Sequence, residues 1–144
     1  MGGAVGTGIV LSGDPQHELG VAFEFHVGVR LSRRWALFGQ LYNIDVRSGP
    51  AVLVLPAVAV QFWPRGGAWW LRASAGLGSD GIAEEADDKI LTAATGFTLW
   101  RRGRFAVSLE VDGYAQWWRP IETQGGWYTS VSAGVGLSFG PRGL

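Results

Sequence analysis

The sequence predicts an all-β fold, a closed eight-stranded antiparallel up-and-down transmembrane β-barrel, and three observations carry this prediction. Bulky apolar residues alternate with small or polar ones over long stretches, a period of two that only an extended strand can use. Tight connections between these stretches alternate with other connections, two of which are clearly longer, as in an up-and-down meander. Aromatic residues gather near the ends of the stretches, as in the two aromatic girdles of a membrane barrel.

Composition limits the class of protein. The 144 residues suffice for one domain with an interior, so a single domain is expected over 1–144, with its last strand at about 127–139 and a short tail at 140–144. The formal net charge of zero argues against nucleic-acid binding. The absence of cysteine excludes disulfides and thiolate metal sites. Met1 is followed by two glycines rather than a secretory signal, so an exported form is expected to be a mature chain with an added start Met.

Eight strands are expected along the chain, beginning with a glycine-rich one at 3–12 that needs its neighbours to hold it. The clearest alternation follows at 18–31, where Leu19, Phe23 and Val27 share one face with four other bulky apolar residues. In 35–46 the apolar residues do not keep one phase, which a bulge near Gly39 would reconcile. The stretch 51–63 is apolar on both faces and contains Pro56, which lacks an amide donor and needs a bulge or a break. The remaining strands are expected at 68–79, 89–100, 104–118 and 127–139.

The connections indicate two different ends. Those at 32–34, 64–67 and 101–103 are tight and basic. The others are 13–17, 47–50, 80–88 and 119–126; two of these are clearly longer, and one is acidic. The acidic residues of 80–88 do not have the spacing of a calcium loop and are interpreted as a solvated loop. The glycines at 76, 78 and 81 match a dinucleotide fingerprint by chance, since carboxylates follow where a pyrophosphate would bind.

The two faces of the strands decide which side meets lipid. The small face is too sparsely charged to meet water, but it suits the narrow lumen of eight strands, so the bulky face is assigned to lipid. Buried charges of both signs must pair, and a ladder of contacts between Arg72 and Glu110, Asp112 or Glu24 is expected to plug the lumen. A gated path for protons or small ions is a weaker possibility. The predicted lumen network is Glu24, His26, Arg30, Arg72, Glu110, Asp112, Tyr114 and Gln116.

Aromatic residues provide an independent test of the membrane interpretation, because two clusters occur at opposite strand ends. One flanks the tight basic turns and the other flanks the last long connection. The residues predicted to lie at the lipid interface are Trp35, Trp63, Trp69, Trp70, Trp100, Phe105, Trp117, Trp118, Trp127 and Tyr128.

The last strand carries the most specific pattern, with alternating apolar residues from Val131 that end at Phe139. Together with the eight-strand meander, it resembles the small bacterial outer-membrane β-barrels of the OmpA-like and OmpX-like type. The resemblance implies a bacterial outer-membrane location and recognition of the strand ending at Phe139 by the barrel assembly machinery. The family usually ends on the aromatic residue, whereas five residues follow it here.

The favoured function is structural, an integral outer-membrane barrel that anchors or interacts through its rims, with the lipid bilayer as its partner and no known protein partner. Two alternatives stay open. Some barrels of this kind modify lipid A, but only His17 and His26 are available as bases, and no serine lies two residues from either. A soluble lipocalin-like barrel would bind an apolar ligand in its lumen. No catalytic residue, metal or cofactor is expected.

Overall fold

The computed structural model describes residues 2–12, 18–46, 52–65, 67–79, 88–118 and 126–139. They form eight β-strands: β1 (Gly2–Ser12), β2 (Glu18–Arg30), β3 (Trp35–Val46), β4 (Val52–Phe62), β5 (Trp69–Ser79), β6 (Asp88–Arg102), β7 (Phe105–Trp118) and β8 (Gly126–Phe139). The predicted strands are confirmed to within two residues at each end. Among the described residues, no helix is long and apolar enough to cross a membrane.

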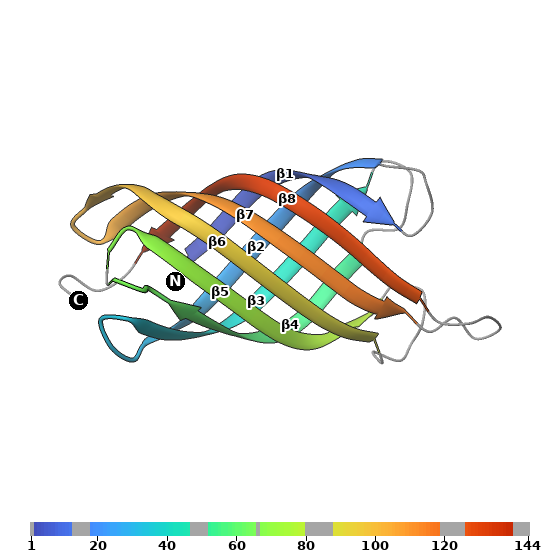
Figure 1. Cartoon of the computed structure of the whole chain (residues 1–144), viewed down its shortest axis with the longest axis horizontal. Coiled ribbons are helices and arrows are strands. Elements are labelled where there is room, and N and C mark those ends of the chain that lie inside the picture. Colours follow the sequence, from blue (N-terminus) through green and yellow to red (C-terminus); the bar gives the residue numbers. More distant parts are fainter. Residues whose placement is uncertain are drawn as a thin grey trace.

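The strands form one curled antiparallel sheet in which each strand pairs with the next along the chain (Figure 1). β1 is paired with β2 and also with β8, where Gly2 lies opposite Ser138 and Ser12 opposite Tyr128. The connection between β6 and β7 is shorter than the turn predicted at 101–103, because β6 continues through Arg102. Gly103 has a φ of 61° at the first of the two turn residues, the position where a tight hairpin of this kind requires glycine.

The alternation predicts the orientation of most described side chains correctly. Most large apolar residues of β2 to β8 point away from the interior, and Leu137 on β8 is 63% exposed. The opposite face is buried and consists mainly of alanine, serine, threonine, glutamine and charged residues, although the large side chain of Ile90 is also fully buried there. This distribution is the inverse of that in a water-soluble domain, whose large apolar side chains are buried.

The irregularity expected in β3 lies elsewhere. β3 pairs with β2 without a shift from Val46 to Ala36. Its pairing with β4 does shift between Gln40 and Asn43, but the extra residue is in β4, so the bulge predicted in β3 near Gly39 is wrong. Phe38 breaks the apolar phase simply because it points inward, where its ring contacts His26 edge-on with centroids 5.0 Å apart. The register shift is in β4, as expected for Pro56: two residues separate Val54 from Ala57, whereas one residue separates their partners in β5.

Two of the predicted interface aromatics are also corrected. Trp63 and Trp70 are buried, and together with Ala36 and Ala94 they form an interior apolar cluster with Phe38 packed against it. Trp70 follows Trp69 directly, and adjacent residues of a strand point to opposite faces, so both could not face lipid. The predicted aromatics whose side chains are described and exposed are Trp35, Trp69, Trp100 and Phe105. The side chains of Trp117, Trp118, Trp127 and Tyr128 lie outside the described residues.

Candidate functional site: an interior charge cluster

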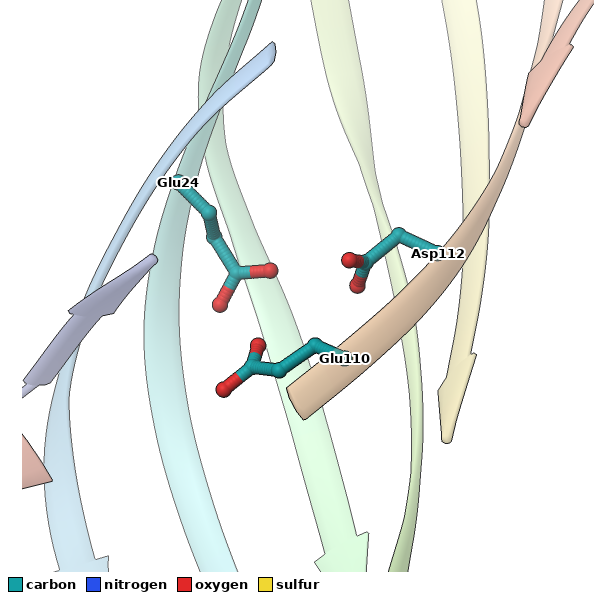
Figure 2. Close-up of side chains that lie close together, drawn as sticks. All are labelled: Glu24, Glu110 and Asp112. Atoms are coloured by element: carbon teal, nitrogen blue, oxygen red, sulfur yellow. The ribbon is translucent and has the colours of Figure 1, made fainter. Parts of the chain in front are cut away.

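Charged side chains from three strands meet inside the curled sheet. β2 supplies Glu24 and His26, β5 supplies Arg72, and β7 supplies Glu110 and Asp112. All five are buried, and Arg72 is only 3% exposed. The alternation of each strand explains this, since residues two apart project from the same face. Figure 2 shows the carboxylates of β2 and β7 pointing toward one another across the interior.

The guanidinium of Arg72 is the centre of this cluster. Its Nη2 lies 2.6 Å from Glu24 Oε2, 3.4 Å from Asp112 Oδ1 and 3.5 Å from Glu110 Oε2. The Glu24 contact is therefore a short charge-assisted hydrogen bond, and the other two are longer and weaker. Since Arg72 is 48 residues from Glu24 and 40 from Asp112, these contacts join distant parts of the chain.

His26 extends the cluster along β2. Its Nδ1 lies 2.8 Å from Glu24 Oε1 and 3.5 Å from Arg72 Nη1. A carboxylate can only accept a hydrogen bond, so Nδ1 is the donor in the His26 tautomer that bonds to the Glu24 carboxylate. Glu24 then has one oxygen on His26 and the other on Arg72. This carboxylate therefore holds two neighbours of the cluster at once, the imidazole on its own strand and the guanidinium on β5.

Neighbouring residues fix Glu110. Ser108 Oγ donates to Glu110 Oε1 at 2.5 Å, and the backbone of Gly136 on β8 leaves the space that this carboxylate fills. A Cβ added at Gly136 would overlap Glu110 Oε1 and Ser108 Oγ.

Arg72 also contacts an aromatic ring. Its guanidinium lies over the Trp70 ring at 4.9 Å from the ring centroid, a favourable cation–π contact.

The cluster holds more acids than bases. Three carboxylates face one guanidinium and one imidazole, and one oxygen from each of the three lies within 4.8 Å of the others. Such a group of oxygens could hold a divalent cation. In this protein the Arg72 Nη2 contacts one oxygen of each carboxylate and already supplies a positive charge to the group. Two buried polar atoms in the interior, Gln40 Oε1 and Arg72 Nε, have no hydrogen-bond partner in the part of the chain that the structure describes.

The structure thus brings together five of the eight residues predicted for the interior network. Tyr114 is buried further along β7, and the side chain of Gln116 lies outside the described residues. Arg30 does not join the cluster, which corrects that prediction: its Nε donates to the carbonyl of Ser32 and its Nη2 to that of Arg33. Arg30 is the last residue of β2, so its side chain reaches the turn rather than the middle of the sheet.

Sequence reasoning missed three residues of this region, Gln40, Trp70 and Ser108. Ser108 has the strand phase of Glu110 and Asp112, so the alternation alone could have identified it. Trp70 likewise shares the phase of Arg72, but its position beside a turn favoured the lipid interface. Gln40 was hidden by the apparent break in the phase of β3, which the inward Phe38 produces.

The arrangement suits a structural role, because the charged side chains of the cluster contact one another and so join three strands. Within the described residues, every ion pair belongs to this cluster. No protein-family model matches the chain, and neither a curated protein nor a solved structure matches it.

Proposed function

We propose that this protein is a closed eight-stranded transmembrane β-barrel of the bacterial outer membrane, with a structural or anchoring role and a lumen plugged by the Arg72 cluster. The observation that carries the proposal is the outward apolar surface of β2 to β8. The exposed large hydrophobic residues are Phe25, Val27, Val29, Leu31, Trp35, Leu37, Leu41, Val58, Val60, Trp69, Leu71, Leu77, Leu91, Phe97, Leu99, Trp100, Phe105, Leu109, Val111, Val131, Val135, Leu137 and Phe139.

Such a surface is far more extensive than the apolar patch of a soluble monomer, and lipid is the medium that stabilises it. The pairing of β1 with both β2 and β8 supports closure, which leaves no sheet edge with unsatisfied backbone groups in hydrocarbon. Phe25 points outward and the buried Arg72 cluster lies in the described interior, both of which argue against a lipocalin-like carrier of an apolar ligand. The outward Phe139 at the end of β8 fits the proposed recognition by the barrel assembly machinery.

Detergent dependence tests this function. The chain should aggregate in water, refold in detergent micelles and migrate differently on a gel before and after heating. Monodisperse protein in buffer without detergent would overturn the proposal.

A pair of matched variants sharpens the test. Val111 lies in the middle of β7 and Leu31 beside a tight turn, and both are exposed. In a bilayer, Val111→Arg should lower the free energy of unfolding by ~2–4 kcal/mol, and Leu31→Arg by at most ~1 kcal/mol, because the cost of a lipid-facing charge falls from the midplane to the interface. In a soluble protein both would be near neutral, since both side chains would already face water.

A further inference from the structure

One end of the sheet concentrates exposed arginines. The connections between β2 and β3, β4 and β5, and β6 and β7 all lie at this end, because consecutive strands are antiparallel. Backbone hydrogen bonds hold them to adjacent strands, from Trp63 N to Arg34 O at 2.9 Å and from Thr98 N to Ala68 O at 2.8 Å. We call the exposed arginines here the arginine end: Arg33, Arg34, Arg65, Arg101, Arg102 and Arg104.

The sequence places no acidic side chain beside the three turns of the arginine end. The chain has no acidic residue between Glu24 and Asp45, between Asp45 and Asp80, or between Asp88 and Glu110. These three acid-free runs contain all three tight turns. The tight turns therefore carry arginines without neighbouring acidic residues in the sequence, although the formal net charge of the chain is zero. None of the arginines at this end forms an ion pair among the described residues, and their combined field attracts external anions.

Apolar and aromatic side chains adjoin these charges. A shallow groove of about 400 Å³ at the turn between β6 and β7 is lined by two arginines, two aromatic residues and a glycine: Trp100, Arg102, Gly103, Arg104 and Phe105. Phe105 contacts the exposed Phe139 with ring centroids 5.0 Å apart, and Arg104 lies over the Phe139 ring at 5.9 Å, so two lining residues of the groove adjoin the apolar exterior. The same sequence of cation and aromatic ring recurs at Arg34 and Trp35.

We propose that the arginine end binds the headgroups of anionic phospholipids, with the groove between Trp100 and Phe105 as its best-formed site. This inference rests on the proposed membrane insertion. Guanidinium forks bind phosphate oxygens through paired hydrogen bonds, and Trp side chains lie at headgroup depth. A soluble polyanion would use the charge but leave the adjoining rings and apolar side chains unmatched, whereas a phospholipid meets both with one molecule.

Native mass spectrometry of the refolded protein tests the site. The protein is equilibrated in micelles containing equal amounts of dioleoylphosphatidylglycerol and dioleoylphosphatidylcholine, and the ratio of the two retained lipids is measured. The wild type should retain phosphatidylglycerol preferentially. Each arginine removed should lower this preference about fivefold, the effect of one basic residue near an anionic surface. Arg102→Gln with Arg104→Gln should therefore nearly abolish it, and Arg33→Gln with Arg34→Gln should reduce it.

Lys89→Gln provides the matched control, since Lys89 is exposed on the same strand as Arg102 but at its other end. Its removal should leave the preference unchanged. Equal loss in K89Q and R102Q would overturn the proposal, because the effect would then be one of overall charge. Displacement of the lipid by inorganic phosphate, at an ionic strength matched with chloride, would also overturn it in favour of a simple phosphate site.

The heat-dependent gel shift separates this proposal from the one on which it rests. A wild type that shows the shift but retains both lipids equally would refute headgroup binding and leave the barrel intact. A chain that is stable in water without detergent would refute both.

Discussion

Two arginines on the interior side of the sheet, Arg72 and Arg30, are accommodated in different ways. Arg72 lies in mid-sheet and contacts carboxylates from β2 and β7, which are at least 38 residues away in sequence. Arg30 binds carbonyl groups two and three residues away and lies 4.2 Å from the centroid of the Trp63 ring. The first side chain joins strands, whereas the second closes a turn. Loss of Arg72 should therefore weaken the whole sheet, and loss of Arg30 should weaken one connection.

The largest effect is expected from Arg72→Ala. Its removal leaves three buried carboxylates without their shared cation, and the free energy of unfolding should fall by ~3–5 kcal/mol. Denaturant titration in micelles, followed by tryptophan fluorescence, measures this. Arg72→Lys should lose less, because it keeps the charge without the fork. A loss below ~1 kcal/mol for R72A would mean that the carboxylates are hydrated or paired elsewhere.

The space beside Glu110 gives the next effect. In Gly136→Ala the added methyl group would displace the Glu110 carboxylate from Ser108 and Arg72, and the cost should be ~1–3 kcal/mol. Gly113→Ala on β7 is the control, since a Cβ there meets only the Ala93 carbonyl at 3.6 Å, an ordinary contact. Equal unfolding midpoints for the two variants would show that Glu110 moves without cost.

The carboxylates of the cluster should differ in how much each contributes to the free energy of unfolding. Glu24 makes two short contacts, so Glu24→Gln should lower the free energy of unfolding by ~1–3 kcal/mol. Asp112 makes a single 3.4 Å contact in a cluster with excess negative charge, so Asp112→Asn should change it by less than ~1 kcal/mol. The same titration ranks the two variants, and the reverse order would contradict the contacts described here.

The smallest effect is expected at the turn. Arg30→Met removes two hydrogen bonds to carbonyls and the contact with Trp63, at a cost of ~0.5–1.5 kcal/mol. Amide hydrogen exchange should locate the loss in the connection between β2 and β3, because local opening need not involve the whole sheet. Arg33→Met, an exposed neighbour, should leave that exchange unchanged. A sheet-wide loss of protection in R30M would place Arg30 with Arg72 in the interior network.

Alternation accounts for what the sequence predicted well. A two-residue period fixes both the extent of a strand and the face on which each residue lies, so Glu24, Arg72 and Glu110 could be placed inside together. Alternation is also the reason why Arg30 was wrongly assigned to the charge network. It predicts the face on which a side chain lies but not which side chains of the neighbouring strands lie beside it. Whether a charge meets carboxylates or turn carbonyls depends on the register between strands, and one sequence does not fix that register.

The aromatic residues show that a position near a strand end does not by itself predict whether a side chain faces lipid or the interior. Trp69 and Trp70 are adjacent, and strand geometry sends one to each face, although both belong to a cluster at a strand end. Trp63 faces inward because the bulge in β4 changes the phase of the residues that follow it. The interior space available to an indole depends on neighbours such as Gly96, where an added Cβ would overlap the Trp70 ring. This fit between Gly96 on β6 and Trp70 on β5 joins two strands, so the sequence around either residue alone does not predict it.

The bulge at Leu55 and Pro56 gives β4 one more residue than β5 between the same two paired positions, and this changes which residues of β4 share a face. Val54 pairs with Gly78 and Ala57 with Gly76, so an even and an odd position occupy the same face of one strand. Deleting either bulge residue would leave one residue between Val54 and Ala57, as between their partners in β5, so both halves of the strand would keep their faces. A single deletion should therefore be tolerated at the bulge, whereas a single deletion elsewhere in β4 would turn part of the strand over unless an insertion nearby compensates for it.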